Sequence, residues 1–246
     1  MAQELPVKEE EIEPISTDRP DQTEASNTIP KHTIQLETGM VYQVENRTDE
    51  TEKVLMYPTS LLRIGVARGF ELRVIHQYIS SRTEAGDMVQ KKKGFDAMAI
   101  GTKIYLCPQK GIRPEISFMG HLTLPTGSKL YRPSVIAPDF KFSLSNQLSE
   151  RVKIGYNLGW YWADGLKNGA AFYTCALGYT IRRKWGFYIE AFGDKGRTGF
   201  ANHLFDGGFT FLPLPNLQLD VSAGHKITAE TPDYYLSCGF SVRLPK

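Results

Sequence analysis

The amino-acid sequence predicts an all-β protein: a single 12-stranded antiparallel up-and-down transmembrane β-barrel with an extended N-terminal segment in or under its lumen. Residues 151–164, RVKIGYNLGWYWAD, alternate strictly between apolar side chains and polar or small ones. Such alternation gives a strand one apolar face, and this run is much longer than the usual strand of about 5–6 residues. A tilted transmembrane strand needs roughly 9–11 residues in the hydrocarbon. No run of 18 apolar residues exists, which excludes a helical membrane span.

The spacing of the predicted strands is the second observation. From Lys31 onward, twelve candidate strands lie at residues 32–45, 53–66, 69–80, 94–106, 113–124, 134–148, 151–164, 169–182, 185–195, 199–212, 216–226 and 232–244. After odd-numbered strands the connections are longer or more polar, as in SRTEAGDMVQKKKG, and after even-numbered strands they are tighter, as in ARG, RRK and PLP. Alternating long and short connections are typical of a barrel with external loops and periplasmic turns, and an even strand number places both termini in the periplasm.

The individual strands show the same two-residue period. The third, 69–80, is the poorest, because Ile75 and Ile79 fall on its polar side. Seven of the other strands show the period through these apolar faces, in chain order: Ile34, Leu36, Met40, Tyr42 and Val44; Met98, Ile100, Ile104 and Leu106; Ile116, Phe118, Leu122 and Leu124; Phe140, Phe142 and Leu144; Val152, Ile154, Tyr156, Leu158, Trp160 and Trp162; Leu217, Leu219 and Val221; and Tyr234, Leu236, Phe240, Val242 and Leu244.

Aromatic residues distinguish this barrel from a soluble β-sandwich, whose strands are shorter and whose outward face is polar. The topology predicts two membrane-interface girdles, an outer one of Tyr42, Trp160, Trp162 and Tyr234, and an inner one of Tyr179 and Trp185.

The remaining composition argues against several functional classes. The net charge of +2 without a basic block gives no sign of nucleic-acid binding, and the three cysteines lack CxxC spacing. HExxH and GxSxG motifs are absent, so we expect no enzyme, and we expect neither a cofactor nor a metal.

The chain divides into an N-terminal segment, residues 1–30, and a barrel, residues 31–246. The segment is rich in Pro, Thr, Asp and Glu without a sustained period, which indicates extended rather than strand structure. The start MAQEL has no signal peptide, and we expect a secretion signal to have been removed.

Several motifs resemble a Gram-negative outer-membrane family of transporters associated with the meta-cleavage pathway of phenol degradation, in a Bacteroidota-like version. They are STDRPDQTE at 16–24, IPK at 29–31 before QLETG at 35–39, IGTK at 100–103, PEI at 114–116, LTLPTG at 122–127, DGGFT at 206–210 and PNLQLD at 215–220. The resemblance covers about residues 16–244 and implies uptake of hydrophobic aromatic compounds. The C-terminus departs from many barrels, which end on an aromatic residue, because this chain continues past Phe240 to Lys246.

Charged residues of both signs mark the predicted lumen. We expect the segment to fold into the periplasmic mouth, where Arg19 would form a bidentate pair with an inward carboxylate such as Glu37 or Glu190. The alternative is a solvated tether, and the lumen itself is either narrow or filled by its own salt bridges. The predicted plug and lumen residues are Thr17, Asp18, Arg19, Pro20, Asp21, Glu24, Glu37, Arg63, Arg73, Lys103, Glu115, Lys141, Lys153, Glu190, Asp206, Asp220 and Arg243.

These features predict a protein of the Gram-negative outer membrane that allows passive passage of small, including hydrophobic, solutes through a narrow or plugged lumen. Its expected partners are outer-membrane lipid and a small hydrophobic solute. The alternative is a non-conducting structural or accessory barrel within a larger outer-membrane protein assembly, with the acidic stretch KEEEIEP as a docking strap.

Overall fold

The computed structural model describes residues 13–163, 168–196, 201–227 and 233–245, and within these ranges the protein is all-β. The strands are β1 (Ile34–Arg47), β2 (Glu50–Ala67), β3 (Phe70–Ala85), β4 (Met88–Phe95), β5 (Ala99–Cys107), β6 (Glu115–Thr123), β7 (Ala137–Gln147), β8 (Val152–Tyr161), β9 (Ala170–Arg182), β10 (Trp185–Gly196), β11 (Asn202–Leu214), β12 (Leu217–Lys226) and β13 (Tyr234–Leu244). Within the described residues, no helix is long and apolar enough to cross a membrane.

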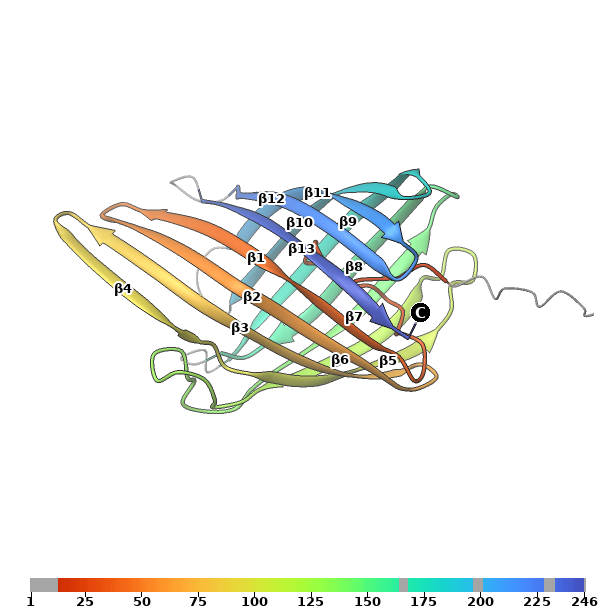
Figure 1. Cartoon of the computed structure of the whole chain (residues 1–246), viewed down its shortest axis with the longest axis horizontal. Helices are drawn as coiled ribbons and strands as arrows, with labels where there is room; N and C mark the ends of the chain where they lie inside the picture. The colour runs from red at the N-terminus through yellow and green to blue at the C-terminus, as the bar shows by residue number, and fades with distance from the viewer. Residues whose placement is uncertain (1–12, 164–167, 197–200, 228–232, 246) are drawn as a thin grey trace, which may run out of the picture.

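The strands form one closed antiparallel barrel (Figure 1). Each strand pairs with its neighbours in the chain, except that β3 pairs with both β4 and β5, and β13 pairs back to β1 to close the ring. Since β4 pairs only with β3, twelve of the 13 strands in the described part of the chain form the barrel wall. This confirms the predicted 12-stranded up-and-down barrel, with one extra strand.

The two-residue period of the sequence places polar side chains inside and apolar side chains outside. In β8, Asn157 is buried and faces the lumen, whereas its neighbour Leu158 is 55% exposed on the outer surface. In β3, Glu71 and Arg73 are buried inside, whereas Leu72 is exposed outside. A surface with exposed apolar side chains around a polar interior is the arrangement of a transmembrane barrel.

The segment 81–94 was predicted to be an external loop, and this prediction was wrong. It continues β3, turns at Gly86-Asp87 and returns as β4, with Ala85 opposite Met88. Gly86 has a φ of 55°, which suits a two-residue hairpin turn. The lysines that suggested a loop are tolerated in β4, because an edge strand accepts charge more readily than a strand inside a sheet. Residues 164–167, 197–200 and 228–232, which cover parts of three other predicted connections and the strand ends beside them, lie outside the described residues.

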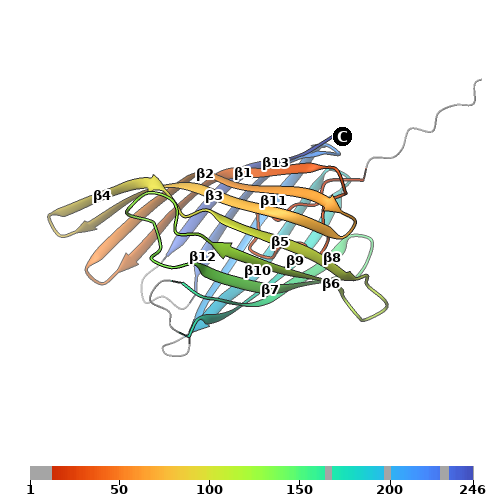
Figure 2. The ribbon, with the colours of Figure 1, turned by 90° about the horizontal axis from the view of Figure 1, so that it is seen from below.

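The two ends of the barrel differ in shape. The hairpins β1–β2 and β3–β4 project together at one end, and the C-terminus lies at the other (Figures 1 and 2). We call these the hairpin end and the terminal end. The predicted girdle residues occupy the outer surface as aromatic groups: Trp160 contacts Trp162 with ring centroids 6.3 Å apart, and Trp185 stacks on Phe211 at 4.3 Å. Tyr179 contacts Phe187 at 5.4 Å.

Candidate functional site

Residues 13–30, which we call the lumen segment, enter the barrel at the terminal end and cross its interior. The backbone N–H of Ile15 donates to the carbonyl of Pro215 at 2.7 Å, and the guanidinium of Arg243 donates to the carbonyl of Glu13. Further along, Ser26 is completely buried and Ile29 is 3% exposed. The part of the predicted acidic strap before residue 13 lies outside the described residues.

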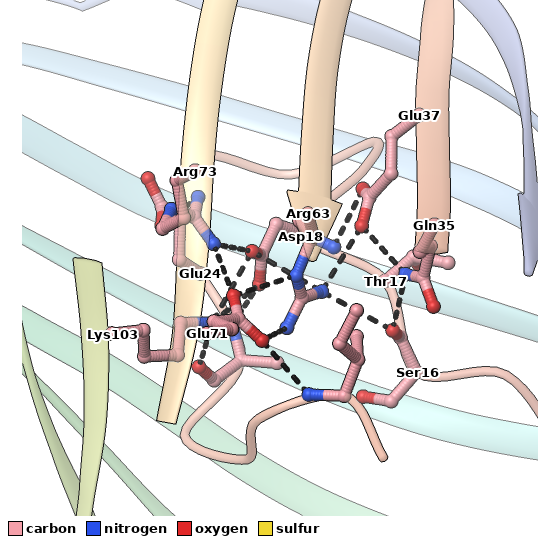
Figure 3. A network of polar contacts seen from close by, with 12 residues as sticks. Ser16, Thr17, Asp18, Glu24, Gln35, Glu37, Arg63, Glu71, Arg73 and Lys103 are labelled. Atoms are coloured by element: carbon pink, nitrogen blue, oxygen red, sulfur yellow. Dashed lines mark hydrogen bonds and ion pairs between the residues drawn. The ribbon is translucent and has the colours of Figure 1, made fainter. Parts of the chain in front are cut away.

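Asp18 is the centre of a buried ionic network (Figure 3). Its carboxylate accepts hydrogen bonds from Arg73 Nη1 at 2.7 Å and from Lys103 Nζ at 3.1 Å, and Arg63 Nη1 lies 3.3 Å away. Burial opposes ionisation of Asp18, but the positive charges of Arg63, Lys103 and Arg73 outweigh it and hold the pKa of this carboxyl well below its usual range. Asp18 is therefore an anion whose charge is shared by cations of three strands, β2, β3 and β5.

The cations around Asp18 are themselves held by carboxylates of the barrel wall. Arg63 forms a bidentate pair with Glu71 at 2.8 and 3.0 Å and also donates to Glu37 at 3.0 Å. Arg73 donates to Glu71 at 2.9 Å. Because all four side chains are at most 1% exposed, their mutual pairing is a condition for burying them.

Arg19 pairs with Asp220, not with Glu37 or Glu190 as expected. Its Nη2 donates to Asp220 Oδ1 at 2.9 Å and its Nε lies 3.4 Å from Oδ2. Glu37, one of the expected partners, instead binds the backbone of the segment: its Oε2 accepts the N–H groups of Asp18 at 2.8 Å and of Arg19 at 3.0 Å. The bidentate geometry was thus anticipated, and its partner was wrong: Glu37 is already engaged by Arg63 and by the segment backbone.

Glycines of two neighbouring strands make room for this guanidinium. Gly39 of β1 lies directly opposite Gly239 of β13. A Cβ at Gly39 would lie 2.7 Å from Arg19 Nη2 and still closer to the Cys238 carbonyl, and a Cβ at Gly239 would lie 2.5 Å from both Arg19 Nη2 and the Thr38 carbonyl. Any side chain at either position would occupy the space of the Arg19 head group.

The middle of the lumen segment is bound by carboxylates of the opposite wall. Glu190 accepts the Gln22 N–H at 2.8 Å and the Thr23 hydroxyl at 2.6 Å. Asp21 lies close to Glu190 and Asp206 in the same region, and burial together with the charge of Glu190 raises the pKa of Asp21 well above its usual value. Asp206, opposite Glu190 in the ladder, accepts a hydrogen bond from the Tyr235 hydroxyl.

Glu24 and Ser26 anchor the end of the segment. Glu24 accepts hydrogen bonds from Arg73 and from Lys141, both at 2.7 Å, and these cations outweigh burial and lower the pKa of Glu24. Ser26 donates to Glu115 Oε1 at 2.5 Å and lies 2.6 Å from the hydroxyl of Ser145.

Neutral polar side chains of the wall, which the sequence analysis did not single out, complete these contacts. Asn157 accepts the Glu24 N–H at 2.8 Å and donates to its carbonyl at 3.1 Å, so it pairs with the segment as a strand would. Gln218 donates to Thr17 Oγ1 at 2.8 Å and to the Arg19 carbonyl at 3.1 Å. Asn157 stands on the polar face of the run RVKIGYNLGWYWAD, so the alternation alone marked it as a lumen residue.

Among the predicted residues, Lys153 is the least connected to the segment. It lines a cavity of about 180 Å³ with Thr17 and Thr23, and Pro20 lines a different cavity beside Arg19. The structure therefore brings the predicted plug and lumen residues into one interior.

Two larger cavities flank the segment. One of about 440 Å³ is lined by Arg19, Gln43, Thr59 and Gln77 together with the apolar Val41, Met56, Phe192, Leu204 and Tyr235. The other, of about 560 Å³, is lined by Glu24, His121, Lys141, Tyr131, Tyr161 and Phe172 among others. His121 lies in a chain in which Arg73 Nε donates to its Nε2 at 3.1 Å, so its Nδ1 carries the proton and donates to Asp139 at 3.0 Å.

Among the described residues, no group of three or more His, Cys, Asp or Glu side chains could hold a metal ion. The interior contains instead two sets of charges bridged by the segment. Such an arrangement can bind the segment, exclude water and present a mixed polar and apolar surface to a solute.

A family model described as "Putative MetA-pathway of phenol degradation" matches residues 17–244, which include most of the lumen segment. No curated protein is recognisably similar in sequence.

Solved structures share the fold at low sequence identity. An outer-membrane channel from Pseudomonas putida F1 has a TM-score of 0.68 at 12% identity, over 92% of this chain and 100% of that chain. The transport unit of the autotransporter AIDA-I from Escherichia coli gives 0.58 at 9% identity, over 86% and 90%. The NanC porin gives 0.54 at 7% identity, over 84% and 98%. Because a channel, an autotransporter unit and a porin share this barrel, the fold alone does not assign a function.

Proposed function

Because the chain belongs to this phenol-degradation family, we propose that it is an outer-membrane channel through which small, including hydrophobic, solutes pass passively, with residues 13–30 as its plug. The terminal end faces the periplasm and the hairpin end faces outward. Passive passage requires no catalytic residue. Origin in a Bacteroidota-like bacterium remains a prediction from sequence.

The observation that carries the proposal is the way in which the segment closes the lumen. A 12-stranded barrel is wider than the eight-stranded barrels that wall side chains alone can fill. Here the space is filled by backbone and side chains of residues that are not part of the wall and that contact strands on opposite sides, from Arg73 of β3 to Glu190 of β10. A filling that belongs to a separate segment can be displaced without unfolding the barrel.

The class of solute follows from the cavities on the two sides of the segment. Volumes of about 440 and 560 Å³ fall in the range of sites for small organic molecules. The first contains Phe192 and Tyr235 beside Arg19 and Gln43. Aromatic and apolar side chains set among hydrogen-bonding and charged groups suit a small aromatic molecule with a polar substituent, such as a phenol.

The test is planar-bilayer conductance of the intact protein beside a version lacking residues 2–28. We expect the intact protein to be mostly closed and the shortened protein to form steady channels. Heat-dependent gel mobility and circular dichroism would establish that both are folded barrels. Folded but silent shortened protein would contradict the channel, and equally conducting proteins would contradict the plug.

The densely paired ionic network around Asp18 also favours a second function, a non-conducting accessory barrel of a larger assembly. Six of the buried residues around Asp18 are charged or amide groups exposed by 1% or less, as in a permanently packed core. Purification in mild detergent separates the two functions: a stoichiometric protein partner supports the accessory barrel, and a monomer that admits solute into liposomes supports the channel.

A further inference from the structure

The outward face of the projecting hairpins contains a row of cations. Lys53 of β2 lies opposite Arg82 of β3, which lies opposite Lys91 of β4. Directly opposite residues of an antiparallel pair share one face, so the three side chains form a line across three strands. Lys93 joins the same face two residues along β4, whereas Lys92, opposite the buried Ser81, points to the other face.

The positive charge of this row exceeds the negative charge beside it. Glu84 is the carboxylate that pairs with it, at 2.7 Å from Arg82 Nε and 3.4 Å from Lys53 Nζ. In the part of the chain that the structure describes, neither Lys91 nor Lys93 has a hydrogen-bond or ion-pair partner, and both are exposed. Like charges directly opposite each other destabilise a sheet, so four cations against one carboxylate favour binding of an anion from outside the protein.

The class of this anion can be inferred from the depth at which the row lies on the outer surface of the barrel. Phe95 of β4 stacks on His76 at 5.0 Å and contacts Tyr78 edge-on at 5.2 Å on the same outward face. Such aromatic clusters lie at the membrane interface in transmembrane barrels. Lys93 and Lys91 lie two and four residues beyond Phe95, about 7 and 13 Å along the strand. Since strands tilt by roughly 35–45°, both lysines lie at the depth of the outer headgroups.

We propose that Lys53, Arg82, Lys91 and Lys93 bind the phosphate groups of an anionic glycolipid in the outer leaflet. The proposal rests on the orientation given under the proposed function, with the hairpin end outward. The guanidinium of Arg82 can grip a phosphate through two donors, and the lysines supply point charges. The lipid thereby covers a strand whose second edge has no partner strand.

The experiment measures lipid retention by the full chain in mild detergent, using native mass spectrometry with diphosphorylated lipid A as the probe. The test variant is Arg82→Gln/Lys91→Gln/Lys93→Gln. The matched control is Lys92→Gln, which removes a charge from the other face of the same strand. Dephosphorylated lipid A and inorganic phosphate are the comparison ligands, and heat-dependent gel mobility reports folding of each variant.

We expect the intact protein and the Lys92→Gln variant to retain diphosphorylated lipid A equally, and the triple variant to bind it about fivefold more weakly for each cation removed. Equal retention by the triple variant would overturn the proposal, as would equal binding of the dephosphorylated lipid or full competition by inorganic phosphate. If the triple variant keeps its lipid but forms dimers, the lysines serve to block edge-to-edge pairing instead. Lipid retention does not depend on conductance, so failure of the channel function would be seen separately.

Discussion

Two carboxyl groups of the lumen segment lie in environments of opposite charge. Asp18 lies among Arg63, Arg73 and Lys103, whereas Asp21, three residues later, lies near Glu190 and Asp206. Removing one partner from a buried ionic network leaves the others uncompensated, which costs about 3–5 kcal/mol. The two residues therefore permit a test in which the same change, a carboxyl to an amide, has different consequences.

Asp18→Asn should release the lumen segment, because three buried cations lose their shared anion. We expect the free energy of segment binding to fall by about 3–5 kcal/mol. A cysteine at the buried position 26, in a protein with Cys107, Cys175 and Cys238 replaced by serine, would then react faster with a maleimide. Asp21→Asn is the control and should leave the cysteine as protected as before or better protected. Equal protection in all three proteins would show that Asp18 does not hold the segment.

Binding of the segment should weaken as the pH rises above 3.8, the ordinary pKa of an aspartate side chain. The pKa values of Asp18 and Glu24 are lowered, so their stabilisation is present above their ordinary values and lost only in strong acid. The pKa of Asp21 is raised, so its contribution is present below its ordinary value of 3.8 and lost as the pH rises through the higher folded value. We expect channel openings to become more frequent in a series of recordings at increasing pH from 4 upward, and Asp21→Asn to reduce this dependence. Openings that increase on acidification within this range would contradict the assignment.

At the scale of strands, the β1–β13 junction both closes the barrel and accommodates Arg19. Gly39→Ala would place a methyl group against the guanidinium, and overpacking of this kind costs about 1–3 kcal/mol. We expect more frequent channel openings in this variant. Gly120→Ala is the control, because a Cβ there would meet nothing closer than 3.7 Å.

The same junction offers a stricter check. In an Arg19→Ala background, Gly39→Ala should change the opening frequency less, because only the contact of its methyl group with the Cys238 carbonyl remains. An unchanged effect in that background would mean that the alanine acts on the strand pairing alone.

Strand positions and faces could be predicted because a two-residue period records which side of a wall each residue faces. The β3–β4 hairpin was missed because charged residues such as Arg82, Lys91 and Lys93 interrupt its outward apolar face, so the two-residue period of hydrophobicity disappears. The partner of Arg19 was missed for a different reason. Glu37 and Asp220 both face the lumen. Which of them the Arg19 guanidinium can reach depends on the relative stagger of β1 and β12, and the sequence of each strand does not specify this stagger.

At the scale of the whole molecule, the cations around Asp18 lie on one wall of the lumen with their partners Glu37 and Glu71, and a cluster of carboxyl groups lies on the opposite wall. Arg63, Arg73 and Lys103 belong to β2, β3 and β5, whereas Glu190, Asp206 and Asp220 belong to β10, β11 and β12. In the ring, β3 and β10 are half a circumference apart. The segment matches this division, since Asp18 and Glu24 meet the cations and Arg19 meets an acid.

The protein lacking residues 2–28 should therefore conduct both signs of ion. Cations and anions each find a favourable wall, and the inward charges are nearly balanced. We expect a reversal potential close to zero in a potassium chloride gradient. Strong preference for either ion would show that the wall rearranges once the segment is absent.

The short connection between the lumen segment and the barrel has a kinetic consequence. Residues 31–33 separate the segment from β1, and their backbone is held by hydrogen bonds such as that from His32 N–H to the Gly65 carbonyl at 2.8 Å. A detached segment thus remains within reach of its own site, at an effective concentration that flexible short tethers bring to roughly millimolar. Reclosure is a unimolecular event, so its rate is independent of protein concentration. A free peptide of the same sequence would compete with the tethered segment for the lumen only at about millimolar concentration.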